Sequence, residues 1–249
     1  FAPNGTLRRG VGALADALAE ALDVRLESEA VGVEEAADGF AVTLREAGGE
    51  VRIEADTLVS ALPARAALQV LEPVLVPAER DVLGSATTVP AIVASVALGR
   101  ALVRNATRVR VPAAEALPAG VISLEPGGEG SVAPEGKMLA TVVARPDWSR
   151  AHLEAADEVV EKALVGVLER LYPGAGNAVE FATLRRHRDA HPRFEVGRFR
   201  ALADLARVAA DRRANGRQLH HAGDHTHAPS LEGAATSARV AVTSALAGV

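Results

Sequence analysis

The stretch that decides the fold lies near the end of the chain and reads Leu219-His-His-Ala-Gly-Asp-His-Thr-His-Ala-Pro-Ser-Leu-Glu-Gly-Ala-Ala-Thr-Ser-Ala-Arg239. A short apolar segment leads to Gly223 and Asp224, a polar loop follows, and Gly233 opens a predicted helix of small residues. Gly223 permits close approach to the backbone, Asp224 can accept hydrogen bonds, and a helix N-terminus offers unpaired N–H groups at its positive end. This order suits a dinucleotide, although a strand, loop and helix without a ligand fit the local pattern equally well.

The composition indicates a globular chain with a large core. The 249 residues are 49% hydrophobic but only 3% aromatic, so Ala, Val and Leu must build that core. The chain has no cysteine, which excludes disulfides, thiolate metal sites and a cysteine nucleophile. The net charge of −5 argues against a nucleic-acid partner, and no apolar run reaches the length of a membrane span. We therefore expect a cytoplasmic protein.

The first 72 residues read as a helix, short strands and one buried strand. Leu14, Leu18 and Leu22 recur every fourth residue, which predicts a helix from Gly12 onward. Short β-like segments with turn residues between them follow at 24–26, 30–33, 40–44 and 51–53. The apolar run 55–63 predicts a fully buried strand. The pattern indicates an open sheet with an attached β-meander.

The middle of the chain has a different pattern of predicted strands and helices. Strands are predicted at 87–98, 138–144 and 179–184, and an amphipathic helix at 154–172, which Pro173-Gly174 ends. Gly127, Gly128 and Gly130 lack a following helix and are typical of a flexible hairpin. Two or three strands and one helix, set between the halves of another unit, predict an inserted substrate domain.

Several motifs follow one another in a familiar order. They are Gly10-Val-Gly12 before the Leu-spaced helix, Val31 in a strand, Asp56-Thr-Leu-Val-Ser-Ala-Leu-Pro63, Ala222-Gly-Asp224, and Pro229-Ser-Leu-Glu-Gly-Ala234. The chain thereby resembles the superfamily of FAD-dependent amine oxidases, protoporphyrinogen oxidases and phytoene desaturases. Ala133-Pro-Glu-Gly136, and Arg186-His187 with Ala190-His-Pro192, resemble the desaturase-like branch. Two departures are His187 at a usually aromatic position and Ser237-Ala238 in place of Ser-Gly.

The resemblance implies a mixed α/β fold. A partial Rossmann-like FAD-binding domain with a β-meander would comprise 1–72 and 193–249, and an α+β substrate domain would comprise 73–192. FAD is the expected cofactor, with Val31 at the adenine, Gly223 and Asp224 by the pyrophosphate and ribityl chain, and Gly233 near the flavin ring. The full set of expected FAD contacts is Val31, Ala61, Pro63, Gly223, Asp224, Ser230, Leu231, Gly233 and Ala234.

The activity implied by the resemblance is dehydrogenation of a C–C or C–N bond, with the hydride passing to the flavin. The substrate would be a mostly apolar small molecule of the isoprenoid, tetrapyrrole or amine type, and contact with a membrane surface is compatible with it. The reaction requires no side-chain acid or base, so no catalytic residue is assigned.

One departure from the family pattern is large. The sequence has no Gly-x-Gly-x-x-Gly segment to hold the FAD pyrophosphate. A second chain or an upstream segment could supply that half, and a sheet without its central strand would expose unpaired edges. The alternative is a non-catalytic binding or scaffolding subunit that keeps the fold without FAD.

Two clusters of charged and titratable residues have competing interpretations. The histidines could hold a metal together with Asp224, but no helical ligand spacing supports this, and we expect no metal. The arginines could bind an anion, although a solvated face after a strand is the favoured interpretation. The clusters are His220, His221, His225 and His227, and Arg185, Arg186 and Arg188.

Overall fold

The computed structural model describes residues 12–214 and 218–247, so Gly10 of the first motif lies outside the described residues. The chain divides into two compact units. Unit 1 comprises the described residues 12–24 and 90–190, and unit 2 comprises 25–89 and the described part of 191–249. The predicted domain boundaries lie at 72/73 and 192/193, whereas the units divide at 24/25, 89/90 and 190/191. The first boundary differs because helix α3 (Pro77–Gly84) packs against α2 (Ala64–Val70) and α6 (Arg198–Ala214) in unit 2.

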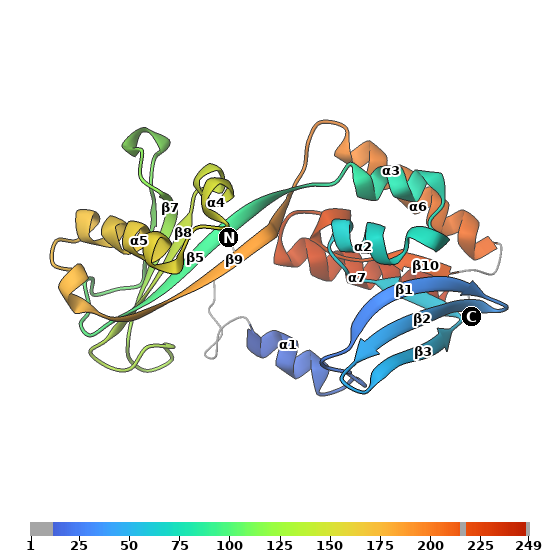
Figure 1. Ribbon diagram of the computed structural model, residues 1–249, viewed down its shortest axis with the longest axis horizontal. Helices are drawn as coiled ribbons and strands as arrows, with labels where there is room; N and C mark the ends of the chain where they lie inside the picture. Colours follow the sequence, from blue (N-terminus) through green and yellow to red (C-terminus); the bar gives the residue numbers. More distant parts are fainter. Residues whose placement is uncertain (1–11, 215–217, 248–249) are drawn as a thin grey trace. The chain divides into compact units, whose positions relative to one another are not determined.

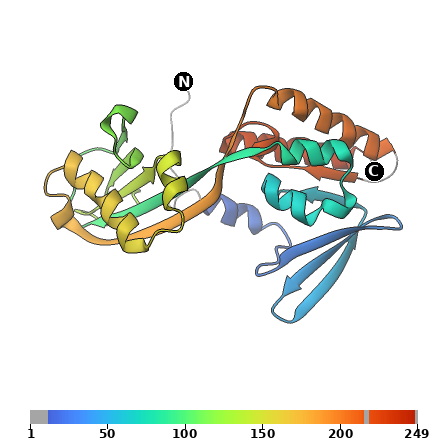
Figure 2. The same ribbon diagram turned by 45° about the horizontal axis from the view of Figure 1, so that its top comes forward.

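Unit 1 is built on a five-stranded sheet with the strand order β6-β7-β8-β5-β9. β8 pairs antiparallel with both β5 and β7, and β6 pairs antiparallel with β7. Helices α4 (Pro146–His152) and α5 (Asp157–Leu171) lie over this sheet (Figures 1 and 2). The strands are β5 (Thr87–Leu98), β6 (Thr107–Arg110), β7 (Ala119–Pro126), β8 (Met138–Ala144) and β9 (Val179–Arg193).

The core of unit 1 forms between α5 and one face of the sheet. Val160, Leu164 and Leu168 are fully buried on α5, at the four-residue spacing of one helix face. Every second residue of β5 from Ile92 to Leu98 is fully buried in the same core. Burial of one such large side chain contributes about 1.5–3 kcal/mol to the stability of unit 1.

The structure corrects the predicted content of the inserted region. In unit 1, five strands and two helices replace the expected two or three strands and one helix, because β6, β7 and α4 were not predicted. β9 continues from the predicted end at Leu184 to Arg193. Its arginines form ion pairs, Arg186 with Asp157 and Arg188 with Glu154.

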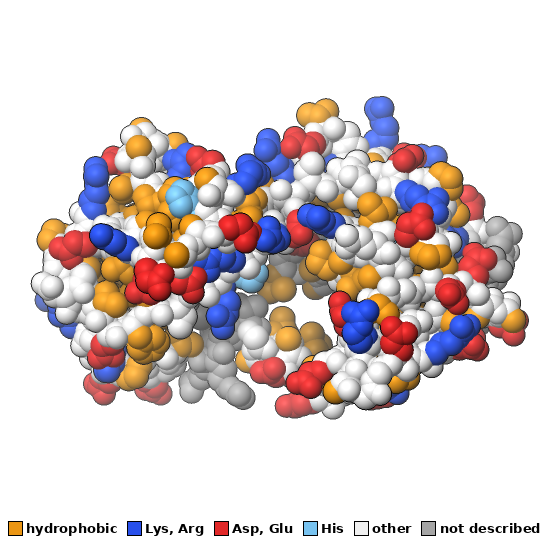
Figure 3. All heavy atoms as spheres, in the orientation of Figure 1, with side chains coloured by type: hydrophobic (Ala, Val, Ile, Leu, Met, Phe, Trp, Pro, Cys, Tyr) orange, Lys and Arg blue, Asp and Glu red, His pale blue; other side chains and the backbone are white. Residues whose placement is uncertain are grey.

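Unit 2 contains the predicted β-meander. β1 (Glu29–Ala36), β2 (Gly39–Glu46) and β3 (Gly49–Ala55) form an antiparallel three-stranded sheet, with turns at the predicted Asp38-Gly39 and Gly48-Gly49 positions. A side chain at Gly39 would lie 2.3 Å from the carbonyl oxygen of Ala55, so this hairpin requires glycine. Figure 3 shows acidic and basic side chains next to one another on this sheet, where Arg45 pairs with Glu29 and Arg52 with Glu34.

The second sheet of unit 2 has two parallel strands, β4 (Thr57–Ser60) and β10 (Gln218–His221). Leu219 of β10 packs in one core with Phe40 of the meander and with Ala67 and Leu71 at α2. The last helix is α7 (Leu231–Leu246). None of the helices in residues 12–214 and 218–247 is long and apolar enough to cross a membrane.

Three details of the sequence interpretation of the first 72 residues are wrong. The run 55–63 is not one strand: Ala55 ends β3 and 57–60 form β4, in which Val59 is 38% exposed because a two-stranded sheet cannot bury it on all sides. Residues 24–26 form no strand. Helix α1 (Gly12–Ala19) ends before Leu22 and buries none of its residues.

Candidate cofactor-binding site

The parallel pairing of β4 and β10 brings two predicted motifs to the same sheet edge. Ser60 at the end of β4 lies opposite His221 at the end of β10, and the Ala222 N–H donates to the Ser60 carbonyl at 2.8 Å. The segments Ala61–Pro63 and Gly223–Asp224 therefore follow the same edge of this sheet. The carboxyl ends of parallel strands are where open α/β sheets bind ligands.

The turn after β10 is held by local packing and by a hydrogen bond to the Gly223 carbonyl. Gly223 has a φ of 135°, which favours glycine, and a side chain there would lie 2.8 Å from Nδ1 of His225. The Thr226 hydroxyl donates to the Gly223 carbonyl at 2.8 Å. Among the described residues, no hydrogen bond or ion pair occupies the carboxylate of Asp224, which is half-buried in the 3₁₀ turn η4 (Asp224–Thr226).

Helix α7 begins with a side-chain cap. The Ser230 hydroxyl accepts a hydrogen bond from the Gly233 N–H at 3.0 Å. This bond satisfies one of the backbone N–H groups that have no partner within the helix at its N-terminus. Gly233 is buried, and a side chain on it would lie 2.1 Å from the Ala228 carbonyl oxygen. Close packing of the loop on the helix therefore requires this glycine even without a ligand. Ala234 is half-buried and Leu231 is 61% exposed.

Val31 lies in the meander rather than at the edge formed by β4 and β10. The pairing of β1 with β2 is irregular between Ala30 and Gly32, so Val31 lies in a β-bulge. A bulge frees local backbone groups from the ladder, which suits a backbone contact with a ligand.

Three histidines near this edge are buried. Within residues 12–214 and 218–247, no group of three His, Cys, Asp or Glu side chains is close enough together to hold a metal ion. His220 and His225 are each 4% exposed, and the side chain of His221 is 3% exposed. Burial, followed by the nearby charges of Arg198 and His221, lowers the pKa of His225 to about 4. His225 is therefore neutral in the folded protein at neutral pH.

The lowered pKa of His225 predicts loss of stability in acid. Unfolded His225 takes up a proton below about pH 6.5, whereas the folded form does so only near 4, so acidification through this window favours unfolding. The full effect is about 3 kcal/mol. We expect urea titrations at pH 7 and 4.5 to show a smaller stability loss for His225→Asn than for the unmodified chain. His227→Asn, on an exposed residue, should keep the original pH dependence, and equal losses in both variants would contradict the assignment.

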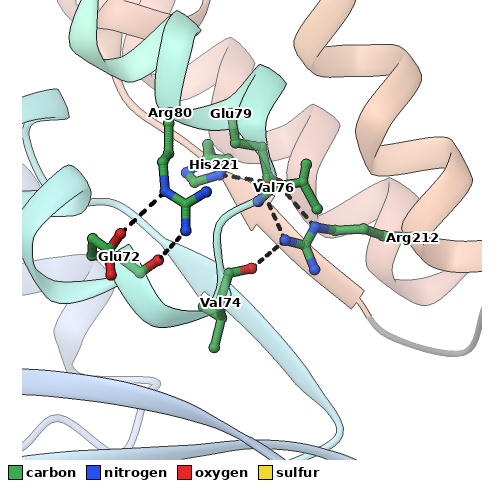
Figure 4. Close-up of polar contacts among 7 residues, drawn as sticks. All are labelled: Glu72, Val74, Val76, Glu79, Arg80, Arg212 and His221. Atoms are coloured by element: carbon green, nitrogen blue, oxygen red, sulfur yellow. Dashed lines mark hydrogen bonds and ion pairs between the residues drawn. The ribbon is translucent and has the colours of Figure 1, made fainter.

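A buried ion pair beneath β10 was missed by the sequence interpretation (Figure 4). Glu79 of α3 is 1% exposed and accepts two hydrogen bonds from Arg212 of α6, at 3.0 and 2.6 Å. Nε2 of His221 lies 3.6 Å from Oε1 of Glu79. Burial alone would raise the pKa of Glu79, but hydrogen bonds from His221, Arg212 and a backbone N–H outweigh it and lower the pKa. These contacts tie α3, α6 and β10 together.

Arg198 was also missed. Its guanidinium is buried and donates to the Val82 carbonyl at 2.6 Å and to the His225 carbonyl at 2.9 Å. Burial lowers its pKa. Arg198 thus holds the turn after Gly223 against the last turn of α3, where helix carbonyls favour a cation. No local sequence pattern indicates this role, because Arg198 is distant in sequence from both Val82 and His225.

A cavity of about 240 Å³ lies where α6, β10 and α7 meet. Its walls include Leu205 and Ala209 of α6 and Val240 of α7, with Ser237 and Ser244 among its polar residues. None of the predicted FAD contacts lines it, but Thr226 and Ser237, which bond Gly223, do.

Comparisons with known proteins place this architecture in a class of flavoproteins. A family profile described as flavin containing amine oxidoreductase matches residues 1–246. The chain belongs to this family, whose members use FAD. The search of curated proteins gives no match.

The fold is also that of solved oxidases. A candidate protoporphyrinogen oxidase from Exiguobacterium sp. 255-15 superposes with a TM-score of 0.71 at 19% identity, covering 96% of this chain and 51% of that one. A redesigned putrescine oxidase gives 0.65 at 17%, covering 95% and 53%. Cyclohexylamine oxidase from Brevibacterium oxydans IH-35A gives 0.65 at 15%, covering 95% and 52%. The chain thus spans about half the length of these proteins.

The residues at the edge of β4 and β10 fit a flavin nucleotide. The Ser60 hydroxyl is buried at the end of β4 without a hydrogen-bond partner among the described residues. The Asp224 carboxylate has no hydrogen-bond or ion-pair partner among the described residues. Together the two side chains offer a hydroxyl and an acceptor, which are groups that the hydroxyls of a ribityl chain can bond.

Proposed function

We propose that this chain forms the distal half of an FAD site in an oxidoreductase that dehydrogenates a C–C or C–N bond. The observation that carries the proposal is the parallel pairing of β4 with β10, whose carboxyl ends lead into the segments Ala61–Pro63 and Gly223–Asp224. Bound FAD would supply the hydride acceptor. The chain's own part is to hold the cofactor through Gly223, Asp224 and the start of α7, with Val31 at the adenine.

The substrate proposed is a mostly apolar small molecule of the amine, isoprenoid or tetrapyrrole type. Two of the structural neighbours are named for amine substrates and one for protoporphyrinogen. The mostly apolar inserted segment is compatible with a lipophilic substrate. In its strands β5 and β8, alternate residues form the core of unit 1 and the residues between them are only partly buried. A desaturase-like activity and a cytoplasmic location, at or away from a membrane surface, belong to the same proposal.

The second part of the proposal is a partner segment that carries Gly-x-Gly-x-x-Gly. Among the described residues, β4 pairs with β10 along one edge and with no strand along the other. Leu231, Val242 and Leu246 lie along one side of α7 and are 61%, 49% and 68% exposed. A strand followed by a helix would cover both surfaces and add the pyrophosphate cradle.

A non-catalytic scaffolding subunit is the second candidate. It is favoured by Gly233, whose packing against Ala228 explains the glycine without any cofactor. The two candidates differ in whether FAD binds.

Absorption spectroscopy distinguishes the two candidates. The chain should be produced alone and together with a segment that carries Gly-x-Gly-x-x-Gly, then mixed with FAD and desalted. We expect a flavin spectrum to remain with the combined protein and little or none with the chain alone. A colourless combined preparation would reject the enzyme and leave the scaffolding role.

A further inference from the structure

Ser237 joins the turn after β10 to helix α7. It is 5% exposed, its hydroxyl accepts the Gly223 N–H at 2.8 Å, and it donates to the Ala234 carbonyl at 2.7 Å. Because the donor and one acceptor position of the hydroxyl are both used, its orientation is fixed. A single buried hydroxyl thus connects the turn at Gly223 with the first turns of α7.

Both backbone groups of Gly223 are held in this way. The β-ladder ends one residue earlier, where Ala222 donates to Ser60, so the sheet does not hold the Gly223 N–H. Ser237 accepts that N–H, while the backbone N–H and the hydroxyl of Thr226 donate to the Gly223 carbonyl at 3.1 and 2.8 Å. The position of the turn relative to α7 therefore depends on Ser237.

The same helix start carries the other expected cofactor contacts. Ser230 caps the first turn, Gly233 packs on the preceding loop, and Ala234 supplies the carbonyl that Ser237 bonds. The turn at Gly223 and the first turn of α7 are consequently one connected surface. A surface arranged before binding loses less conformational freedom when a ligand arrives.

We propose that Ser237 is a positioning residue for the cofactor: it sets the Gly223–Asp224 turn at a fixed place against the start of α7, so that FAD meets both at once. This inference rests on the proposed function. It assigns no contact between Ser237 and the cofactor. Loss of the hydroxyl would leave the buried Gly223 N–H without its acceptor and release the turn.

Ser237→Ala tests this inference, with Ser244→Ala as the matched control. Ser244 lies two turns further along α7, borders the same cavity and has no hydrogen bond to the turn among those of the described residues. We expect hydrogen exchange at the Gly223 amide to become about 10-fold faster in Ser237→Ala and to stay unchanged in Ser244→Ala.

FAD affinity provides the second readout, measured by flavin fluorescence on the chain combined with the Gly-x-Gly-x-x-Gly segment. We expect about 10-fold weaker binding for Ser237→Ala, unchanged binding for Ser244→Ala, and partial recovery in Ser237→Thr, which keeps the hydroxyl. Equal affinity of Ser237→Ala and the unmodified protein would overturn this inference alone. Failure of the unmodified protein to bind FAD would overturn it together with the proposed function.

Discussion

Glu79→Gln is expected to destabilise unit 2 by about 3 kcal/mol, because it leaves the Arg212 guanidinium buried without a countercharge. The carboxylate accepts two hydrogen bonds from Arg212 and a third, at 3.0 Å, from the Val76 N–H at the start of α3. Urea unfolding followed by far-UV circular dichroism measures the loss. The fluorescence of Trp148, the single tryptophan, reports unit 1 in the same sample.

The neighbouring pair of Glu72 and Arg80 provides the control. Glu72 has a 60% exposed side chain 3.2 Å from Arg80, so Glu72→Gln should cost less than about 1 kcal/mol. A double variant, Glu79→Leu with Arg212→Met, should recover much of the stability because it removes both charges. Equal effects of Glu79→Gln and Glu72→Gln would show that the buried pair does not hold α3 to α6.

Gly233→Ala is expected to cost about 2–4 kcal/mol, from overpacking together with disturbance of the Ser230 cap. The added carbon would lie 2.1 Å from the Ala228 carbonyl oxygen, and backbone cannot move aside as a flexible side chain can. The loop from Ala222 to Ser230 must therefore shift relative to α7. Thermal unfolding followed by circular dichroism measures this effect.

Gly166→Ala separates this clash from the general effect of placing alanine in a helix. Gly166 lies within α5, and a side chain there would meet no atom within 4 Å. Alanine is the better helix former, so this variant should be up to about 1 kcal/mol more stable than the unmodified chain. If Gly233→Ala were also neutral or stabilising, the tight packing at the start of α7 would be refuted.

The parts of the fold that the sequence predicted are those marked by local pattern. Asp38-Gly39 and Gly48-Gly49 mark hairpins because few residues suit such turns, and the alternation in 87–98 and 138–144 marks strands with one buried face. The end of α5 was predicted by Pro173 and Gly174, which cannot continue a helix. The family and its flavin followed from motif order rather than from these local patterns.

The parts that it did not predict depend on contacts between distant residues. Glu79 and Arg212 look like ordinary surface charges in sequence, and their burial follows only from the packing of α3 on α6. Ser237 looks like a variant motif residue until its hydroxyl is seen to accept the Gly223 N–H. Val59 belongs to an apolar run, yet it is partly exposed because its sheet has two strands.

The most direct test of the central claim is hydrogen–deuterium exchange with and without FAD, on the chain combined with a Gly-x-Gly-x-x-Gly segment. The account predicts slower exchange with FAD in peptides covering 57–63 and 222–234, and no change in 119–144 of the unit 1 sheet. Bound FAD without protection of 222–234 would contradict the assignment of the Gly223–Asp224 turn and the start of α7 to the cofactor site.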